Sequence, residues 1–169
     1  MDPTLHWGGG YYGFKNVAQL LLAAGADPNK QSLGRHTPLH NAARGGHKDV
    51  AQLLLDSGAD PNKANIYDDT PLHLAVWNDH KDVVQLLLDR GADPNKTIKH
   101  KGWGPLHIAV YYGFRMDVIK LLLAGGADVN MADLTGKTPL QLTANTHPKD
   151  IRHKDVIPLL LENGAEPQN

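Results

Sequence analysis

Residues 37–62 read TPLHNAARGGHKDVAQLLLDSGADPN, and parts of this segment return along the chain in the same order. The Leu-His pair that begins at Leu39 recurs at Leu72 and Leu106, with a degraded copy at Leu5 and a Leu-Gln variant at Leu140. Successive copies therefore lie 33 or 34 residues apart, and each is followed by a leucine triplet and by Gly-Ala-Asp or Gly-Ala-Glu. A fixed period near 33 residues is typical of stacked helical repeats, which usually serve as binding surfaces.

Local chemistry predicts two helices in each repeat. Thr37 is a good N-cap, because its hydroxyl can accept a hydrogen bond from a first-turn amide, and Pro38 suits the first helical position. Further along, Val50 and Leu54 lie on one apolar face of a second helix, and Gly58 suits the left-handed position that ends it. The Thr-Pro pair returns in two later repeats, and glycine replaces the threonine in the fourth, at Thr70, Thr138 and Gly104.

The Thr-Pro-Leu-His motif, the Gly46-His47 pair, the leucine triplets and Gly-Ala-Asp-Pro-Asn together closely resemble the ankyrin repeat. The resemblance covers nearly the whole chain and implies an all-α solenoid of about five helix–turn–helix units. Short first helices would line its concave side, and β-turn fingers would project from it. The resemblance also implies that the motif histidines bind backbone between neighbouring repeats, at His40, His73 and His107. We expect one domain, residues 1–169, with repeats near 1–29, 30–62, 63–95, 96–130 and 131–169.

The first and last repeats depart from this pattern. Trp7-Gly8-Gly9-Gly10 is poor in helix formers, so we expect a frayed first helix there, and whether the segment is helical stays open. No polar N-terminal cap is evident, which indicates either an excised segment or an end that something else covers. The fourth repeat has one extra residue in its finger, and the fifth carries an insertion at 146–152. We expect Pro158 in the first turn of the last helix.

Composition excludes several classes of protein. With 17 basic and 18 acidic side chains, the chain has no charge excess that would attract nucleic acid or an anionic membrane. It has no cysteine, no apolar run near the roughly 18 residues of a membrane span, and no signal peptide that we recognise. We therefore expect a cytoplasmic protein, unless it is engineered, that is a monomer when free.

No catalytic, cofactor or metal site is predicted, so we do not expect an enzyme. No serine stands beside a readable base, and the glycines after Trp7 lack the lysine of a phosphate loop. The only metal-like spacing is that of His147, Asp150 and His153, which lacks a fourth ligand. The segment 99–101, Lys-His-Lys, could touch phosphate, but such a short run is more often a solvated loop.

Aromatic residues fall only in the finger and first-helix half of each repeat, where they would form a strip along the binding side. Trp7, Tyr11 and Tyr112 could equally be structural, whereas we expect Trp77 and Trp103 to bind a partner. Asp68, Asp69 and Asp79 would give this patch an acidic rim. The predicted partner-binding residues are Tyr67, Asp68, Asp69, Trp77, Asn78, Asp79, Trp103, Tyr111 and Tyr112.

The sequence is therefore interpreted as a protein-binding module that grips a partner protein with its fingers and concave first helices. Its origin stays open between an engineered binder and an ankyrin segment of a natural adaptor or microbial effector. A self-associating scaffold, assembled through the uncapped first repeat, is a further alternative. The identity of the partner is not legible, because binding faces vary by substitution on a constant frame.

Overall fold

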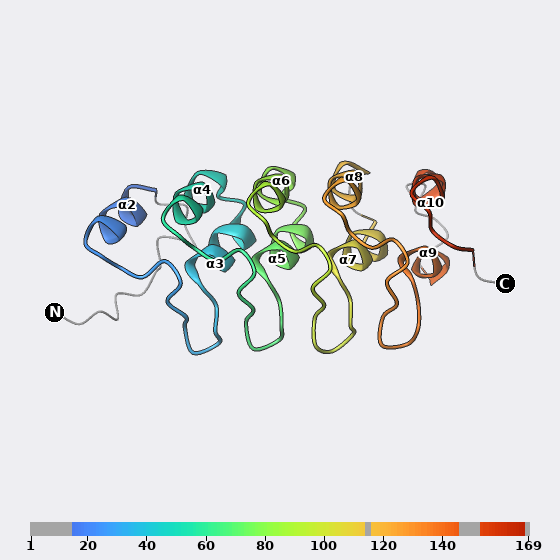
Figure 1. Cartoon of the computed structure of the whole chain (residues 1–169), viewed down its shortest axis with the longest axis horizontal. Coiled ribbons are helices and arrows are strands. Elements are labelled where there is room, and N and C mark those ends of the chain that lie inside the picture. Colours follow the sequence, from blue (N-terminus) through green and yellow to red (C-terminus); the bar gives the residue numbers. More distant parts are fainter. Residues whose placement is uncertain (1–14, 114–115, 146–152, 168–169) are drawn as a thin grey trace. The chain divides into compact units, whose positions relative to one another are not determined.

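The computed structural model describes residues 15–113, 116–145 and 153–167. Within these ranges the regular structure consists of nine α-helices and one short 3₁₀ helix, without a strand, which confirms the all-α prediction (Figure 1). None of the helices in these ranges is long and apolar enough to span a membrane. The chain divides into two compact units, residues 1–92 and 93–169, and the prediction of a single domain stays a prediction.

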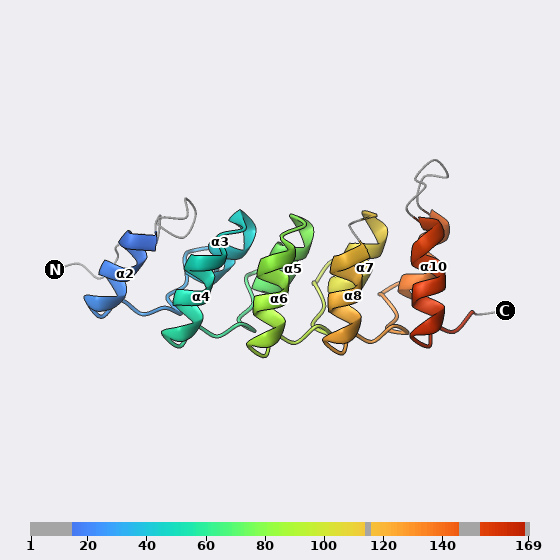
Figure 2. The same ribbon diagram turned by 90° about the horizontal axis from the view of Figure 1, so that it is seen from above.

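The first unit contains two layers of helices. Its helices are α2 (Lys15–Ala23), α3 (Pro38–Gly45), α4 (Lys48–Asp56), α5 (Pro71–Trp77) and α6 (Lys81–Asp89). The first helices of two repeats, α3 and α5, pack side by side, while the second helices α2, α4 and α6 follow one another in a second layer (Figures 1 and 2). Within a repeat, α3 packs on α4 and α5 packs on α6. This is the predicted helix–turn–helix stacking.

The second unit contains α7 (Pro105–Tyr111), α8 (Met116–Ala124), α9 (Pro139–Leu142), the 3₁₀ helix η1 (Thr143–Asn145) and α10 (His153–Glu162). Here α7 packs against both α8 and α9. The expectation for Pro158 was wrong, since it lies inside α10 rather than in its first turn. The helix tolerates the proline at an exposed position, at the cost of one backbone hydrogen bond.

Reciprocal caps begin the first helices, as the Thr-Pro motif predicts. The Thr37 hydroxyl accepts from the His40 amide at 3.4 Å, and His40 Nδ1 accepts from the Thr37 amide at 3.0 Å. Gly104 keeps only half of this arrangement: its amide donates to His107 Nδ1 at 3.2 Å, but it has no hydroxyl to offer. The fourth repeat therefore has a weaker cap than the repeats that begin with Thr-Pro.

The motif histidines also join neighbouring repeats. Because Nδ1 of His40 accepts a hydrogen bond, Nε2 is the donor, and it lies 3.0 Å from the Asp69 carbonyl oxygen. Nε2 of His107 lies 3.3 Å from the Lys137 carbonyl oxygen in the same way. Burial lowers the pKa of His40 to about 4 and also lowers the pKa of His107. Both rings therefore act as neutral, structural groups at neutral pH.

Asparagines of the Asp-Pro-Asn turns form a second connection between repeats. Asn29 donates from Nδ2 to the Gly58 carbonyl at 2.8 Å and accepts the Asp60 amide at Oδ1, also at 2.8 Å. In the second unit the same pair of bonds recurs at Asn95 with Gly126 and Asp128, and at Asn130 with Gly164 and Glu166. These asparagines therefore clamp neighbouring repeats together, a role that was not predicted from the sequence.

A glycine and a histidine fit together where α3 ends. Gly46 adopts a φ of 70°, and a Cβ built on it would lie 2.6 Å from Nδ1 of His80. This open space lets the His80 ring reach the Arg44 carbonyl, with Nε2 3.0 Å from the oxygen. His80 thus ties the start of α6 to the end of α3, in the preceding repeat.

Candidate partner-binding surface

Four hairpin-like fingers lie in the described ranges and project from the helices (Figure 1). We name them by their residues: the 32–36 and 65–69 fingers of the first unit, and the 98–103 and 133–137 fingers of the second. Backbone bonds between the end residues close them, such as Asn65 to Asp69 at 3.0 Å and Ile98 to Trp103 at 2.9 Å. The 98–103 finger is the longer one, in agreement with the extra residue that the sequence shows.

In the 65–69 finger, one buried side chain shapes the tip. Oδ1 of Asn65 accepts from the amides of Tyr67, at 2.8 Å, and Asp69, at 3.0 Å. Asp68 takes a φ of 63°, the left-handed conformation that aspartate tolerates better than most residues. The tip therefore presents Ile66, Tyr67 and Asp68 to solvent, with Tyr67 49% exposed. Tyr67 and Asp68, both predicted to bind a partner, are therefore accessible to one.

Asp69 does not belong to an exposed acidic rim, and that expectation was wrong. Its residue is 8% exposed, and Oδ2 accepts from Nδ2 of Asn65 at 3.0 Å. Burial raises the pKa of Asp69, while the Asn65 hydrogen bond and the nearby His36 and Arg44 act in the opposite direction. Its carbonyl also accepts from His40, so the residue holds the finger to the preceding repeat.

The first unit exposes two apolar finger residues that the sequence analysis missed. Leu33 is fully exposed at the turn of the 32–36 finger, and Ile66 is exposed on the next finger. The Ile66 amide donates to the Gly34 carbonyl at 3.2 Å, which places the two tips side by side. Together with Tyr67 they form an apolar finger-tip surface. An apolar residue at the turn position was the signal that could have identified Leu33.

The remaining predicted residues of the first unit lie where α5 ends. Trp77 is the last residue of the helix and is half-buried. Asn78 is exposed and donates from Nδ2 to the Leu74 carbonyl at 2.8 Å, and Asp79 is half-buried with a φ of 54°. The three residues thus form the turn into α6. Tyr67 comes from the finger and Trp77 from the helix end, so the residues come from separate elements of the same repeat.

Trp103 was expected to bind a partner, but the structure buries its side chain. It is 5% exposed, and its indole Nε1 donates to Oδ2 of Asp133 at 2.9 Å. Its ring centroid lies 4.7 Å from that of Tyr111, and the Lys101 ammonium lies 3.9 Å above it. The indole is covered because the adjacent finger supplies the acceptor and the neighbouring side chains close over the ring.

Asp133 organises the next finger as well as holding Trp103. Its Oδ1 accepts from the amides of Thr135, at 2.8 Å, and Lys137, at 3.0 Å, and from the Thr135 hydroxyl at 2.7 Å. Burial alone would raise the pKa of Asp133, but these hydrogen bonds and that of Trp103 lower it to about 2. The carboxylate is therefore charged at neutral pH, and its oxygens accept hydrogen bonds from both fingers.

Tyr111 and Tyr112 are exposed at the end of α7, as expected for a binding surface. Their ring centroids lie 5.1 Å apart in an edge-to-face arrangement. Leu134, which the sequence analysis missed, is 70% exposed on the 133–137 finger, and its amide donates to the Lys101 carbonyl at 3.0 Å. Lys101 thus links the two elements: its ammonium lies near the Tyr111 ring at the end of α7, and its carbonyl accepts from Leu134 in the 133–137 finger.

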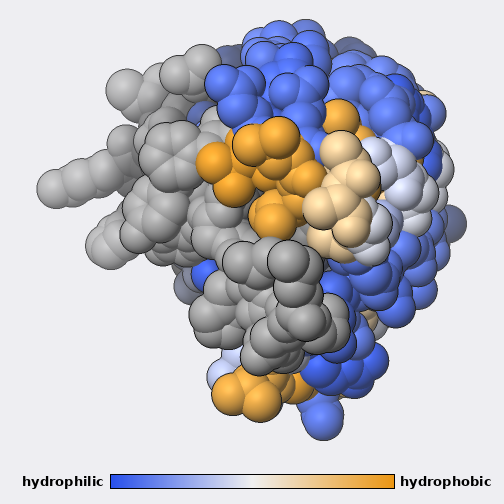
Figure 3. Space-filling model, turned by 90° about the vertical axis from the view of Figure 1, so that its left-hand side faces the viewer, coloured by the Kyte–Doolittle hydropathy of each residue, from blue (hydrophilic) through white to orange (hydrophobic). Residues whose placement is uncertain are grey.

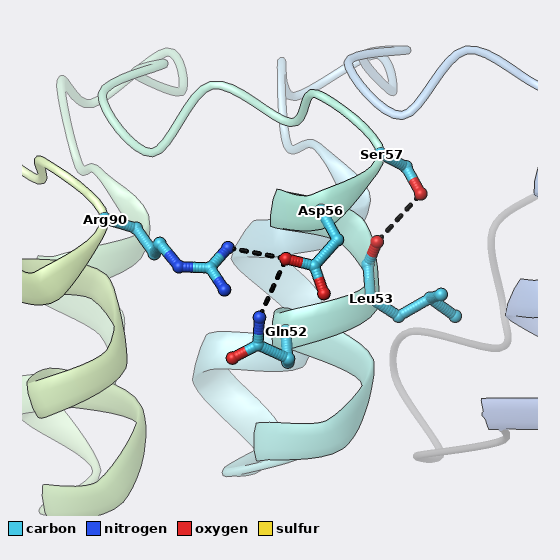
Figure 4. Close-up of polar contacts among 5 residues, drawn as sticks. All are labelled: Gln52, Leu53, Asp56, Ser57 and Arg90. Carbon is cyan, nitrogen blue, oxygen red and sulfur yellow. Dashed lines mark hydrogen bonds and ion pairs between the residues drawn. The ribbon is translucent and has the colours of Figure 1, made fainter.

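The outward side of the second helices has a different character. In Figure 4, Oδ1 of Asp56 accepts from Arg90 at 2.8 Å and from Gln52 at 2.9 Å. Hydrogen bonds from Gln52 and Arg90 lower the pKa of Asp56. The Ser57 hydroxyl donates to the Leu53 carbonyl at 2.8 Å close by. Polar side chains on this side of the first unit thus bind one another, and the side offers a hydrophilic surface.

Apolar side chains are also exposed on two terminal helices. Val17 and Leu20 of α2 are exposed, Leu20 by 72%, and Figure 3 shows hydrophobic atoms on this end of the molecule. On α10, Ile157 and Leu161 are exposed. The residue of α4 that corresponds to Val17 is Val50, which is buried. These helices therefore expose positions that the repeat pattern covers elsewhere.

A metal site can be assessed only within the described part of the chain. No group of three or more His, Asp or Glu side chains there could hold a metal ion. The three residues with metal-like spacing in the sequence are not tested by this result. His147 and Asp150 lie outside the described residues, as does the side chain of His153. Trp7, Tyr11, Tyr12 and the glycines after Trp7 also lie outside them.

Comparison with known proteins supports the repeat interpretation. A family model described as ankyrin repeats (3 copies) matches residues 5–98 and again residues 91–169. Together these matches cover nearly the whole chain. No curated protein is significantly similar to it.

Proposed function

The chain belongs to the ankyrin repeat family, a family of protein–protein interaction modules, and we propose that it recognises a partner protein through its fingers and first-helix ends. The partner would contact the finger-tip surface of the first unit and the tyrosines of the second. The proposal holds for an engineered binder and for a segment of a natural adaptor alike. It requires no cofactor and no catalytic step.

The distribution of exposed apolar side chains carries this proposal. Among the described residues, six large exposed hydrophobic side chains lie in fingers or at the end of α7: Leu33, Ile66, Tyr67, Tyr111, Tyr112 and Leu134. Four more lie on the terminal helices α2 and α10, and none lies on α4, α6 or α8. Burying such residues against a partner is favourable, and clustered exposed apolar groups normally mark an interaction site.

Site-specific photocrosslinking tests the proposal. A benzophenone amino acid would replace Ile66 or Tyr111 on the proposed side, and Gln85 or Lys120 on the second helices as matched controls. All four residues are exposed. In extract from the cells that contain the partner, we expect crosslinks to one discrete protein from the first pair only. Crosslinking mainly from positions 85 and 120 would place the partner on the second helices and contradict the proposal.

A second candidate function is self-association through α2. The observation that favours it is the exposure of Val17 and Leu20 on one helix of the first unit. Two copies could bury these side chains against each other. Light scattering over a range of concentrations would detect the dimer, and Leu20→Glu should abolish it, since a charge cannot be buried without a partner. A chain that remains monomeric at high concentration would exclude this candidate.

A further inference from the structure

The second unit carries a continuous surface that the proposed function leaves without a defined ligand. We call it the tyrosine–lysine surface, and it consists of Lys101, Tyr111, Tyr112 and Leu134 over the buried ring of Trp103. The Lys101 ammonium lies 3.9 Å from the Trp103 ring centroid and 5.4 Å from that of Tyr111. The Leu134 amide binds the Lys101 carbonyl, so helix end and finger tips form one surface.

We propose that this surface binds an acidic segment of the partner protein, one in which aspartate or glutamate side chains flank an apolar residue. The inference rests on the proposed function and specifies which kind of side chains the partner presents to this surface. The carboxylates would meet Lys101 and Lys99, and the apolar residue would lie against the tyrosine rings and Leu134. A cation held over aromatic rings is suited to bind a carboxylate while the rings bury carbon.

Charge complementarity is the basis of this choice. The tip of the finger carries Lys99, His100 and Lys101, all of them exposed. Within the described residues, no carboxylate forms an ion pair with Lys99 or Lys101. The carboxylate of Asp133, in the adjacent finger, already accepts hydrogen bonds from Trp103, Thr135 and Lys137. Among the described residues, the charges of Lys99 and Lys101 are therefore left available to a ligand.

The apolar part of the surface argues for a protein segment rather than a nucleic acid. Leu134 is 70% exposed and provides a branched aliphatic contact, which a phosphate backbone does not use. The net charge of −1 also gives the chain as a whole no attraction for polyanions. In the first unit, by contrast, the 65–69 finger presents Tyr67 beside the exposed Asp68. The two units thus offer different charges to a partner.

A displayed library of random twelve-residue peptides, selected on the full-length protein, provides the test. We expect selected sequences to be enriched in aspartate and glutamate beside an apolar residue. Their affinity should fall about tenfold for Lys101→Glu and about thirtyfold for Tyr111→Ala. Lys120→Glu makes the same charge change on α8 and should leave the affinity unchanged. Affinity for the wild-type protein should also fall with added salt, because exposed charges are screened.

Each other result of the selection has a definite meaning. Peptides that lose affinity with Tyr111→Ala but carry no acidic excess would overturn this inference and leave the proposed function standing. A library that gives no saturable binding at any finger would overturn both. Tyr111→Phe keeps the ring and should retain most of the affinity, which separates loss of binding from loss of folding. A labelled uridine oligonucleotide that binds through Lys101 more tightly than the peptides would assign the surface to RNA and overturn the inference.

Discussion

The indole Nε1 of Trp103 donates a hydrogen bond of 2.9 Å to Oδ2 of Asp133, across two fingers that are 30 residues apart in sequence. The tryptophan is thereby buried, although it belongs to a projecting loop. Asp133 also receives the amides that shape its own finger. One carboxylate therefore sets the conformation of its own finger and its attachment to the preceding one.

Replacing Trp103 should destabilise the second unit. Trp103→Phe keeps a ring but removes the indole donor, and should cost about 1 kcal/mol of unfolding free energy in denaturant titrations. Trp103→Ala also empties the space and should cost about 3–5 kcal/mol. The same Trp103→Phe change should raise the pKa of Asp133 from about 2 toward its ordinary value of 3.8, measured by NMR. An unchanged pKa would show that the indole contributes little to the carboxylate.

Two glycine substitutions separate backbone strain from steric conflict. Gly46→Ala and Gly58→Ala both place a side chain at positive φ, 70° and 88° respectively. A Cβ at Gly58 meets no heavy atom within 4 Å, whereas one at Gly46 lies 2.6 Å from the His80 ring. Gly58→Ala should cost about 1–2 kcal/mol in chemical denaturation. Gly46→Ala should cost at least about 1 kcal/mol more, because it also displaces His80 from the Arg44 carbonyl. Equal costs would contradict this account.

The repeat frame could be predicted from sequence because its signals are local. Thr37-Pro38 specifies a helix start by its own capping chemistry, and the structure begins α3 at Pro38. The burial of Trp103 could not be predicted in the same way, since its acceptor and cover come from residues distant in sequence. The burial of Asp69 could not be predicted for a related reason. It depends on the folded conformation of the finger, in which the Asn65 side chain donates a hydrogen bond to the Asp69 carboxylate.

The exposed apolar finger residues were within reach of the sequence. Leu33 and Leu134 occupy turn positions equivalent to Ile66, and aligning the repeats would have placed all three at finger tips. They are aliphatic, so the pattern of aromatic residues does not include them. The asparagine clamps were similarly visible, since Asn29, Asn62, Asn95 and Asn130 recur near the repeat period. The partners of these asparagines could not be predicted from sequence, however, because they depend on how closely the next repeat packs.

The asparagine clamp should stabilise each junction that it spans. Asn95→Ala removes both the bond to the Gly126 carbonyl and the acceptor for the Asp128 amide, and should cost about 1–2 kcal/mol of stability. Asn163→Ala is the control, because Asn163 makes one exposed bond to Leu159 within its own repeat and should cost less. Thermal and denaturant unfolding measure both. A larger cost at Asn163 would mean that the clamp adds nothing.

Acidification should weaken the fold through buried histidines. Burial lowers the folded pKa of His40 to about 4 from the ordinary 6.5, and lowers the pKa of His36 and His107 as well. The unfolded chain therefore binds more protons, so this stability is present above pH 6.5 and is lost as pH falls toward 4. Each such proton contributes up to about 1.4 kcal/mol per pH unit. NMR titration of the His40 ring checks the cause, and a midpoint near 6.5 would refute it.

Trp77 should be a central contact of the partner in the first unit. It lies half-buried at the end of α5, so we expect its truncation to cost less stability than at a fully buried position. Trp77→Ala should weaken binding roughly thirtyfold, as for other central tryptophans, and leave the melting temperature nearly unchanged. Asp68→Asn, at an exposed finger residue, should alter mainly the association rate and its salt dependence. Affinity and melting temperature are measured for both variants. Full affinity in Trp77→Ala would place this residue outside the interface, and unfolding would assign it to the core.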